Sequence, residues 1–169
     1  MKELDEVEKK IKEKLQQIVI ESKNATKQNK NSDEWWTKGV KKKLCNLAHE
    51  MDYAVTANGC DDAEDKQEWL FDMIWTHKEE FKEIILAMEC EWSKNRDDVL
   101  EDFEKLLVVR SKYRIFIFNQ YNRSEIENMM EEFRKKIDKF KSTLSGDRYF
   151  FAGYCVDEDE VIFDNKMVP

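Results

Sequence analysis

Apolar residues recur every three or four positions in four segments of the chain, which is the spacing of an amphipathic helix. The first segment, residues 3–24, carries its stripe at Leu4, Val7, Ile11, Leu15, Ile18 and Val19. The same period follows Asp33, runs from about Asp97 to Arg110, and returns after Ser124. The sequence therefore predicts four helices. Ser124 and Glu127 have the spacing of a capping box, which predicts where the last one begins.

Between these helices the apolar period shortens to two, or gives way to short unbroken apolar runs, as expected of β-strands. An Asn-Gly turn signal closes the first such segment, and the acidic turn 157–160 separates the last two, which predicts a hairpin. The run at 113–118 is apolar almost throughout, as in a strand buried on both faces. Six strands are expected, at residues 53–57, 68–76, 84–92, 113–118, 148–156 and 161–163.

This order of elements predicts an α/β fold with a mixed sheet. A three-strand meander is followed by a helical crossover that makes strand 113–118 parallel to strand 84–92. Four Gly and one Pro leave no sign of a linker, so residues 1–169 are expected to form a single domain. Within it, 1–31 is a helical extension, 33–120 the core, and 121–169 a final helix with strands. The first helix could fold onto the domain or form a homodimer, and its stripe leaves both open.

Composition places the chain among compact intracellular proteins. It has 41% hydrophobic residues but no apolar stretch near the roughly 18 residues of a membrane span. Four cysteines without CxxC pairing indicate a reduced, cytoplasmic setting and make zinc unexpected. The net charge of −8 lowers the expectation of tight, non-specific nucleic-acid binding without excluding it. A lysine-rich run is typical of a solvated helix face: Lys38, Lys41, Lys42 and Lys43.

Three carboxylates stand within otherwise apolar predicted strands. Asp72 lies between Phe71 and Met73, and Glu89 and Glu91 lie two apart on the next strand, so they share a face about 7 Å apart. A desolvated carboxylate costs several kcal/mol unless it is paired or bound to metal. Each acid alone could face water or pair with a cation. Together, on neighbouring strands, they indicate a site for Mg²⁺ or Mn²⁺.

Three segments carry a resemblance to a known family: WLFDMIW, AMECEWS and DFEKLLVVRS. In their order along the chain they resemble the PD-(D/E)XK nuclease superfamily, and as a set they are similar to its uncharacterised bacterial members. The resemblance covers roughly residues 35–120. It implies a restriction-endonuclease-like αβββαβ core, with Asp72 and Glu89 as ligands of Mg²⁺ or Mn²⁺. The implied activity is hydrolysis of phosphodiester bonds in nucleic acid, with DNA expected.

The chain departs from the family pattern where the motif has its lysine, because Glu91 stands there. Some members carry Glu at this position and others take a lysine from the following helix. Lys105 is the candidate for that role, and a solvated surface lysine fits its place outside the apolar stripe equally well. Glu91 could add a ligand or orient the attacking water. Glu50, at the end of the helix after Asp33, resembles an additional acid of some members.

Two functions remain open at this stage. The first is a metal-dependent nuclease, which the retained Asp72 and Glu89 favour, since costly acids are expected to disappear from a disused site. The second is a non-catalytic protein-interaction domain that keeps the nuclease fold, which the acidic charge and the missing motif lysine favour.

Overall fold

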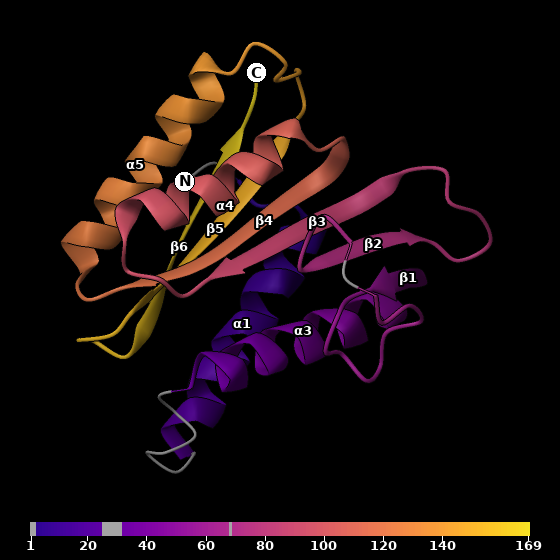
Figure 1. Cartoon of the computed structure of the whole chain (residues 1–169), viewed down its shortest axis with the longest axis horizontal. Helices are drawn as coiled ribbons and strands as arrows, with labels where there is room; N and C mark the ends of the chain where they lie inside the picture. The colour runs from indigo at the N-terminus through magenta and orange to yellow at the C-terminus, as the bar shows by residue number, and fades with distance from the viewer. Residues whose placement is uncertain (1–2, 25–31, 68) are drawn as a thin grey trace.

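The computed structural model describes residues 3–24, 32–67 and 69–169. In this part of the chain, a six-stranded mixed sheet carries two helices on each face (Figure 1). The helices are α1 (Glu6–Asn24), α3 (Asp33–Glu50), α4 (Arg96–Val108) and α5 (Arg123–Lys139). The strands are β1 (Tyr53–Thr56), β2 (Met73–His77), β3 (Ile84–Glu91), β4 (Ser111–Gln120), β5 (Arg148–Cys155) and β6 (Glu160–Met167).

Neighbours in the sheet follow the order of the chain, β1 to β6. The pairs β1–β2 and β2–β3 are antiparallel, β3–β4 and β4–β5 are parallel, and β5–β6 is antiparallel. The predicted meander, the parallel crossover through α4 and the final hairpin are therefore confirmed. The α/β class and the mixed sheet are confirmed with them.

The second strand begins later than predicted. β2 starts at Met73, so Asp72 lies just before the strand and not at its centre. The Oδ2 atom of Asp72 accepts a hydrogen bond from the backbone N–H of Cys90 on β3, at 2.9 Å. The backbone pairing of β2 and β3 ends at Met73 and Met88, and beyond it the carboxylate of Asp72 accepts the hydrogen bond of the Cys90 N–H group. Leu70 is 77% exposed, so the apolar residues before Asp72 are not a buried strand.

The last helix also begins at a different residue. Asn122, not Ser124, is the N-cap of α5, and its side chain accepts from the backbone N–H of Glu125. Glu125 in turn accepts from the backbone N–H of Tyr121. The cap therefore lies two residues earlier than Ser124 and Glu127, because Asn caps a helix as well as Ser does, and the reciprocal bond of Glu125 goes to the residue before the N-cap.

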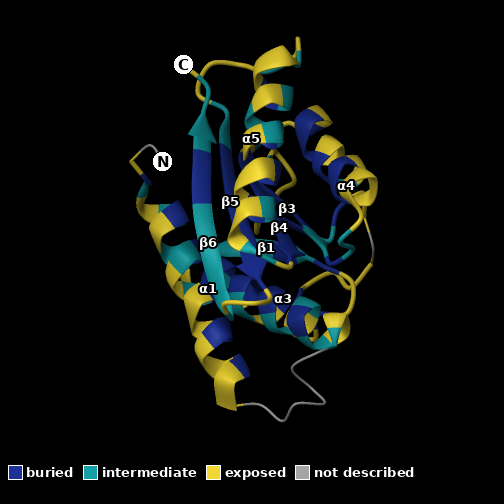
Figure 2. Ribbon diagram, turned by 90° about the vertical axis from the view of Figure 1, so that its left-hand side faces the viewer, coloured by how far each residue is buried: buried dark blue, intermediate teal, exposed yellow. Residues whose placement is uncertain are grey.

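Each face of the sheet has its own apolar core (Figure 2). Alternate β4 residues divide between them: Tyr113, Ile115 and Ile117 face α1 and α3, and Phe116 and Phe118 face α4 and α5. This is the period-two alternation of a strand covered on both sides.

The first helix folds onto its own domain. Its stripe is buried in the core with α3, and Ile11 and Ile18 have almost no exposed surface. Glu8, 1% exposed, forms an ion pair with Arg148 of β5, at 2.5 Å between Oε2 and Nη2. These contacts use the apolar surface that a dimer through α1 would need.

None of the described helices has both the length and the apolar character needed to cross a lipid bilayer.

Candidate functional site

The sheet brings Asp72 and Glu89 together. Met73 of β2 pairs with Met88 of β3, so the preceding and the following residue, Asp72 and Glu89, lie across from each other where the ladder ends. Glu89 is only 4% exposed and shares the α4 side of the sheet with Ala87. The closeness of the two carboxyl groups follows from the register of two strands, which is the juxtaposition predicted from the sequence.

Burial keeps Glu89 protonated near neutral pH. Desolvation raises the pKa of its carboxyl group from 4.5 to about 8, and the neighbouring charge of Asp72 adds to the rise. Lys105 acts in the opposite direction, because its ammonium charge favours the ionised form. Within the described residues, the buried Oε1 atom of Glu89 has no hydrogen-bond partner. A buried polar atom left without a partner is rare in folded proteins and requires an explanation.

Asp72 is held by a lysine that the sequence did not single out. Its Oδ1 atom lies 2.9 Å from Nζ of Lys41 on α3, while Oδ2 accepts from Cys90. Lys41 is only 6% exposed and also donates to the backbone oxygen of Asn58, at 3.0 Å. Its place in a lysine-rich run predicts a solvated face, which is wrong for this residue. The reason is its ion pair with the half-buried Asp72, a partner 31 positions further along the chain.

Two residues of α4 complete the group. Lys105 lies 2.5 Å from Asp102, Nζ to Oδ1, one turn apart on the helix, and its charge interacts with Glu89 and Asp72. Burial raises the pKa of Glu91, and the neighbouring carboxyl group of Asp102 adds to the rise. Although Lys105 is exposed to solvent, it belongs to the site. We call this group the acidic cluster: Asp72, Glu89, Glu91, Asp102 and the two lysines Lys41 and Lys105.

Asp102 is a site residue that the sequence reasoning missed. It stands in the same short segment as Lys105, DFEKLL, three residues before it. That spacing places both side chains on one helical face, away from the apolar stripe. The sequence therefore shows that Asp102 and Lys105 are neighbours on the helix. That Asp102 lies near Glu91 follows only from the packing of α4 against β3.

Glu50 is not part of the acidic cluster. Its side chain is exposed and forms an ion pair with Lys14 of α1, at 2.8 Å between Oε1 and Nζ. It stands nine residues after Lys41 on α3, which corresponds to about 14 Å along the helix axis.

The donor chemistry of the cluster suits a hard divalent cation, since it consists of carboxylate oxygens. Its geometry in this structure is not that of a finished metal site. In the described part of the chain, no three His, Cys, Asp or Glu side chains are grouped so that they could hold a metal ion. Both Asp72 oxygens are engaged by Lys41 and Cys90, whereas Oε1 of Glu89 remains without a partner.

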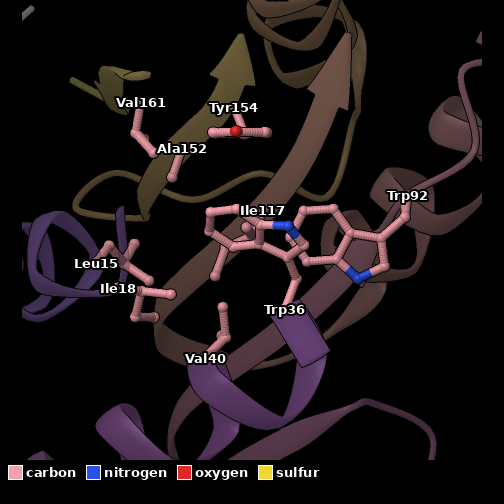
Figure 3. Close-up of a pocket in the computed structure, with 9 residues that line it drawn as sticks. All are labelled: Leu15, Ile18, Trp36, Val40, Trp92, Ile117, Ala152, Tyr154 and Val161. Atoms are coloured by element: carbon pink, nitrogen blue, oxygen red, sulfur yellow. The ribbon is translucent and has the colours of Figure 1, made fainter. Parts of the chain in front are cut away.

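An apolar cavity lies on the opposite face of the sheet (Figure 3). Trp36 of α3 and Trp92 line it with their ring centroids 6.1 Å apart, and Tyr154 closes it from β5. Its volume of about 20 Å³ suffices for one water molecule. Trp92 Nε1 donates to Thr37 Oγ1, at 2.7 Å, so its polar atom is satisfied. The hydroxyl of Tyr154 is likewise engaged, since it donates to Oδ1 of Asp159, and the cavity is a gap in core packing among the described residues.

Comparisons of the chain with protein-family models, with curated proteins and with solved structures found no match.

Proposed function

We propose that the chain is a metal-dependent nuclease that hydrolyses phosphodiester bonds of nucleic acid, DNA above all, at the acidic cluster. The observation that carries the proposal is the buried Glu89, beside Asp72, with an oxygen that has no partner among the described residues. Such a carboxyl group destabilises the fold, and it is explained if a cation binds there. The order α3-β1-β2-β3-α4-β4 is also the αβββαβ order of a restriction-endonuclease-like core.

Each residue of the cluster has a role in this proposal. Asp72 and Glu89 hold Mg²⁺ or Mn²⁺, and Glu91 supplies a further oxygen or orients the attacking water. The cation would polarise the scissile phosphate and lower the pKa of that water. Lys105, on α4, provides a positive charge that stabilises the negative charge developing on the phosphate. Asp102 positions Lys105 through their ion pair.

One observation favours the competing function, a protein-interaction domain that keeps the fold without cutting. Lys41 already neutralises Asp72, so part of the charge that would attract a cation is satisfied within the protein. A cation must therefore compete with Lys41 for Oδ1 of Asp72. A nuclease requires that millimolar metal displaces Lys41 from Asp72, whereas an interaction domain does not.

A calorimetric titration with Mn²⁺ tests the proposal, with Asp72→Ala and Glu89→Gln as site variants. The matched control is Glu13→Gln, which removes an exposed carboxylate from α1. We expect saturable binding at millimolar Mn²⁺ by the wild type and the control, and none by the two site variants. A wild-type chain that binds no metal, or site variants that bind it equally well, would refute the assignment.

A further inference from the structure

The parallel strands β3 and β4 end on the same side of the sheet, and α4 and α5 begin just after these two strand ends (Figure 1). A pocket opens at these strand ends. Its volume of about 280 Å³ is close to that of the smallest small-ligand sites. Its lining comes from the β3–α4 connection, the end of β4 and α5: Lys94, Arg96, Gln120, Glu125, Asn128, Met129 and Glu132.

Gln120 is the feature that makes this pocket a built site. It is 5% exposed, and within the described residues its side-chain amide has no hydrogen-bond partner. A buried amide that lines a pocket offers both a donor and an acceptor to whatever occupies it. A second amide, that of Asn128, lies on the α5 wall of the same pocket.

The charges of the pocket are balanced, which argues against a free anion as its ligand. Arg96 forms an ion pair with Glu132 at 2.9 Å, and the two remaining charged residues of the lining, Lys94 and Glu125, are of opposite sign. The site therefore offers hydrogen bonds without a net charge. Tyr121 follows Gln120 directly, is 53% exposed, and lies with its ring centroid 5.2 Å from Nζ of Lys94. Tyr121 thus lies outside the lining but against Lys94, which belongs to it, and an exposed aromatic ring next to a pocket with two amides is suited to a flat, polar, neutral ligand.

The pocket lies close to the acidic cluster. Glu91 pairs with Phe118 on β4, and Gln120 is two residues further along the same face. Strand spacing and rise place the Cα atoms of Glu91 and Gln120 roughly 8 Å apart, about the length of one nucleotide. A nucleic-acid strand whose phosphate lies at the cluster thus brings a neighbouring base within reach of Gln120.

We infer that this pocket binds one unpaired nucleobase, so that the site acts on nucleic acid whose bases are accessible, as in a single strand. The inference rests on the proposed function for the position of the phosphate. Gln120 and Asn128 hydrogen-bond the edge of the base, an arrangement that amides make with adenine, and Tyr121 stacks on its face.

The test uses neutral nucleosides as probes, because they carry the base without a phosphate that the acidic cluster would repel. Deoxyadenosine, deoxycytidine, deoxyguanosine and thymidine are titrated into the full chain without metal, and binding is followed by NMR. We expect saturable binding, strongest for deoxyadenosine, with a dissociation constant on the order of 1 mM. Gln120→Leu weakens it about fivefold, the loss expected for one hydrogen bond.

Two further variants make the test decisive. Tyr121→Ala changes an exposed side chain, so it keeps the fold and weakens binding fivefold or more if the ring stacks on the base. Gln17→Leu, at an exposed position of α1, is the matched control and leaves binding unchanged. Nucleosides that do not bind, binding insensitive to Gln120 and Tyr121, or displacement by inorganic phosphate would each overturn the inference. Since no metal is present, a chain that binds nucleosides but never cuts nucleic acid contradicts the proposed function and leaves the pocket standing.

Discussion

The buried Glu89 predicts how the stability of the protein depends on pH. Its pKa of about 8 in the folded chain lies above the value of 4.5 for a free glutamate, so the folded state holds the proton more tightly. Protonation of Glu89 therefore stabilises the folded state relative to the ionised form. This contribution to the free energy of unfolding is fully present below pH 4.5 and is lost progressively as the pH rises toward 8. A two-state treatment with these values gives a loss of about 2.5 kcal/mol between pH 5 and pH 7.

Glu89→Gln removes this dependence, because the neutral amide resembles the protonated carboxyl group. Urea unfolding of wild type and variant, with EDTA present, measures the free energy of unfolding at each pH. We expect the difference in the free energy of unfolding, variant minus wild type, to increase by about 2.5 kcal/mol from pH 5 to pH 7. Titrating groups that do not interact with Glu89 contribute equally to both chains and cancel.

The control Glu13→Gln should leave its own difference from wild type nearly constant over the same range. A Glu89→Gln difference that stays flat within about 0.5 kcal/mol, an allowance for extrapolation error, would show that Glu89 is not desolvated as the structure has it. Glu89 would then no longer be a costly buried acid that a bound cation explains.

Three further predictions address the site and the fold. Lys105→Ala should lower the rate of cleavage about 100-fold or more with metal affinity nearly unchanged, and equal losses of both would contradict its role at the phosphate. Lys41→Met should tighten Mn²⁺ binding several-fold in calorimetry, since it removes the competitor at Asp72, and weaker binding would refute that competition. Ile18→Ala should cost about 2–4 kcal/mol of unfolding free energy independently of protein concentration; a concentration-dependent loss would instead place the α1 stripe in a dimer interface.

The helices and strands with a strong apolar pattern were predictable, because each buries either one face or its whole surface and the pattern of side chains reflects that burial. The α1 and α3 stripes, the unbroken run of β4 and the final hairpin each follow directly from side-chain period. The predicted strand start at residue 68 lies outside the described residues, and residues 69–72 precede the strand, since Trp69 and Leu70 are apolar yet exposed. Apolar character alone does not distinguish a strand from a surface segment that carries large side chains.

The candidate site was predictable only where one strand or one pair of strands decides the geometry. Glu89 and Glu91 share a face because they lie two apart, and the β2–β3 register brings Asp72 to them. Lys41 and Asp102 depend on how α3 and α4 lie against the sheet, which local spacing does not specify. Gln120 escaped notice because its importance comes from burial at the end of β4.

The most direct test of the account is cleavage of a mixed set of DNA and RNA substrates, single-stranded and duplex, in the presence of Mn²⁺. Wild type is compared with Glu89→Ala and with the control Glu13→Gln. We predict cutting by the wild type and the control and none by Glu89→Ala, because the buried acid beside Asp72 is required for the reaction. Absence of cutting by the wild type on every substrate, or cutting by Glu89→Ala at the wild-type rate, would contradict the account.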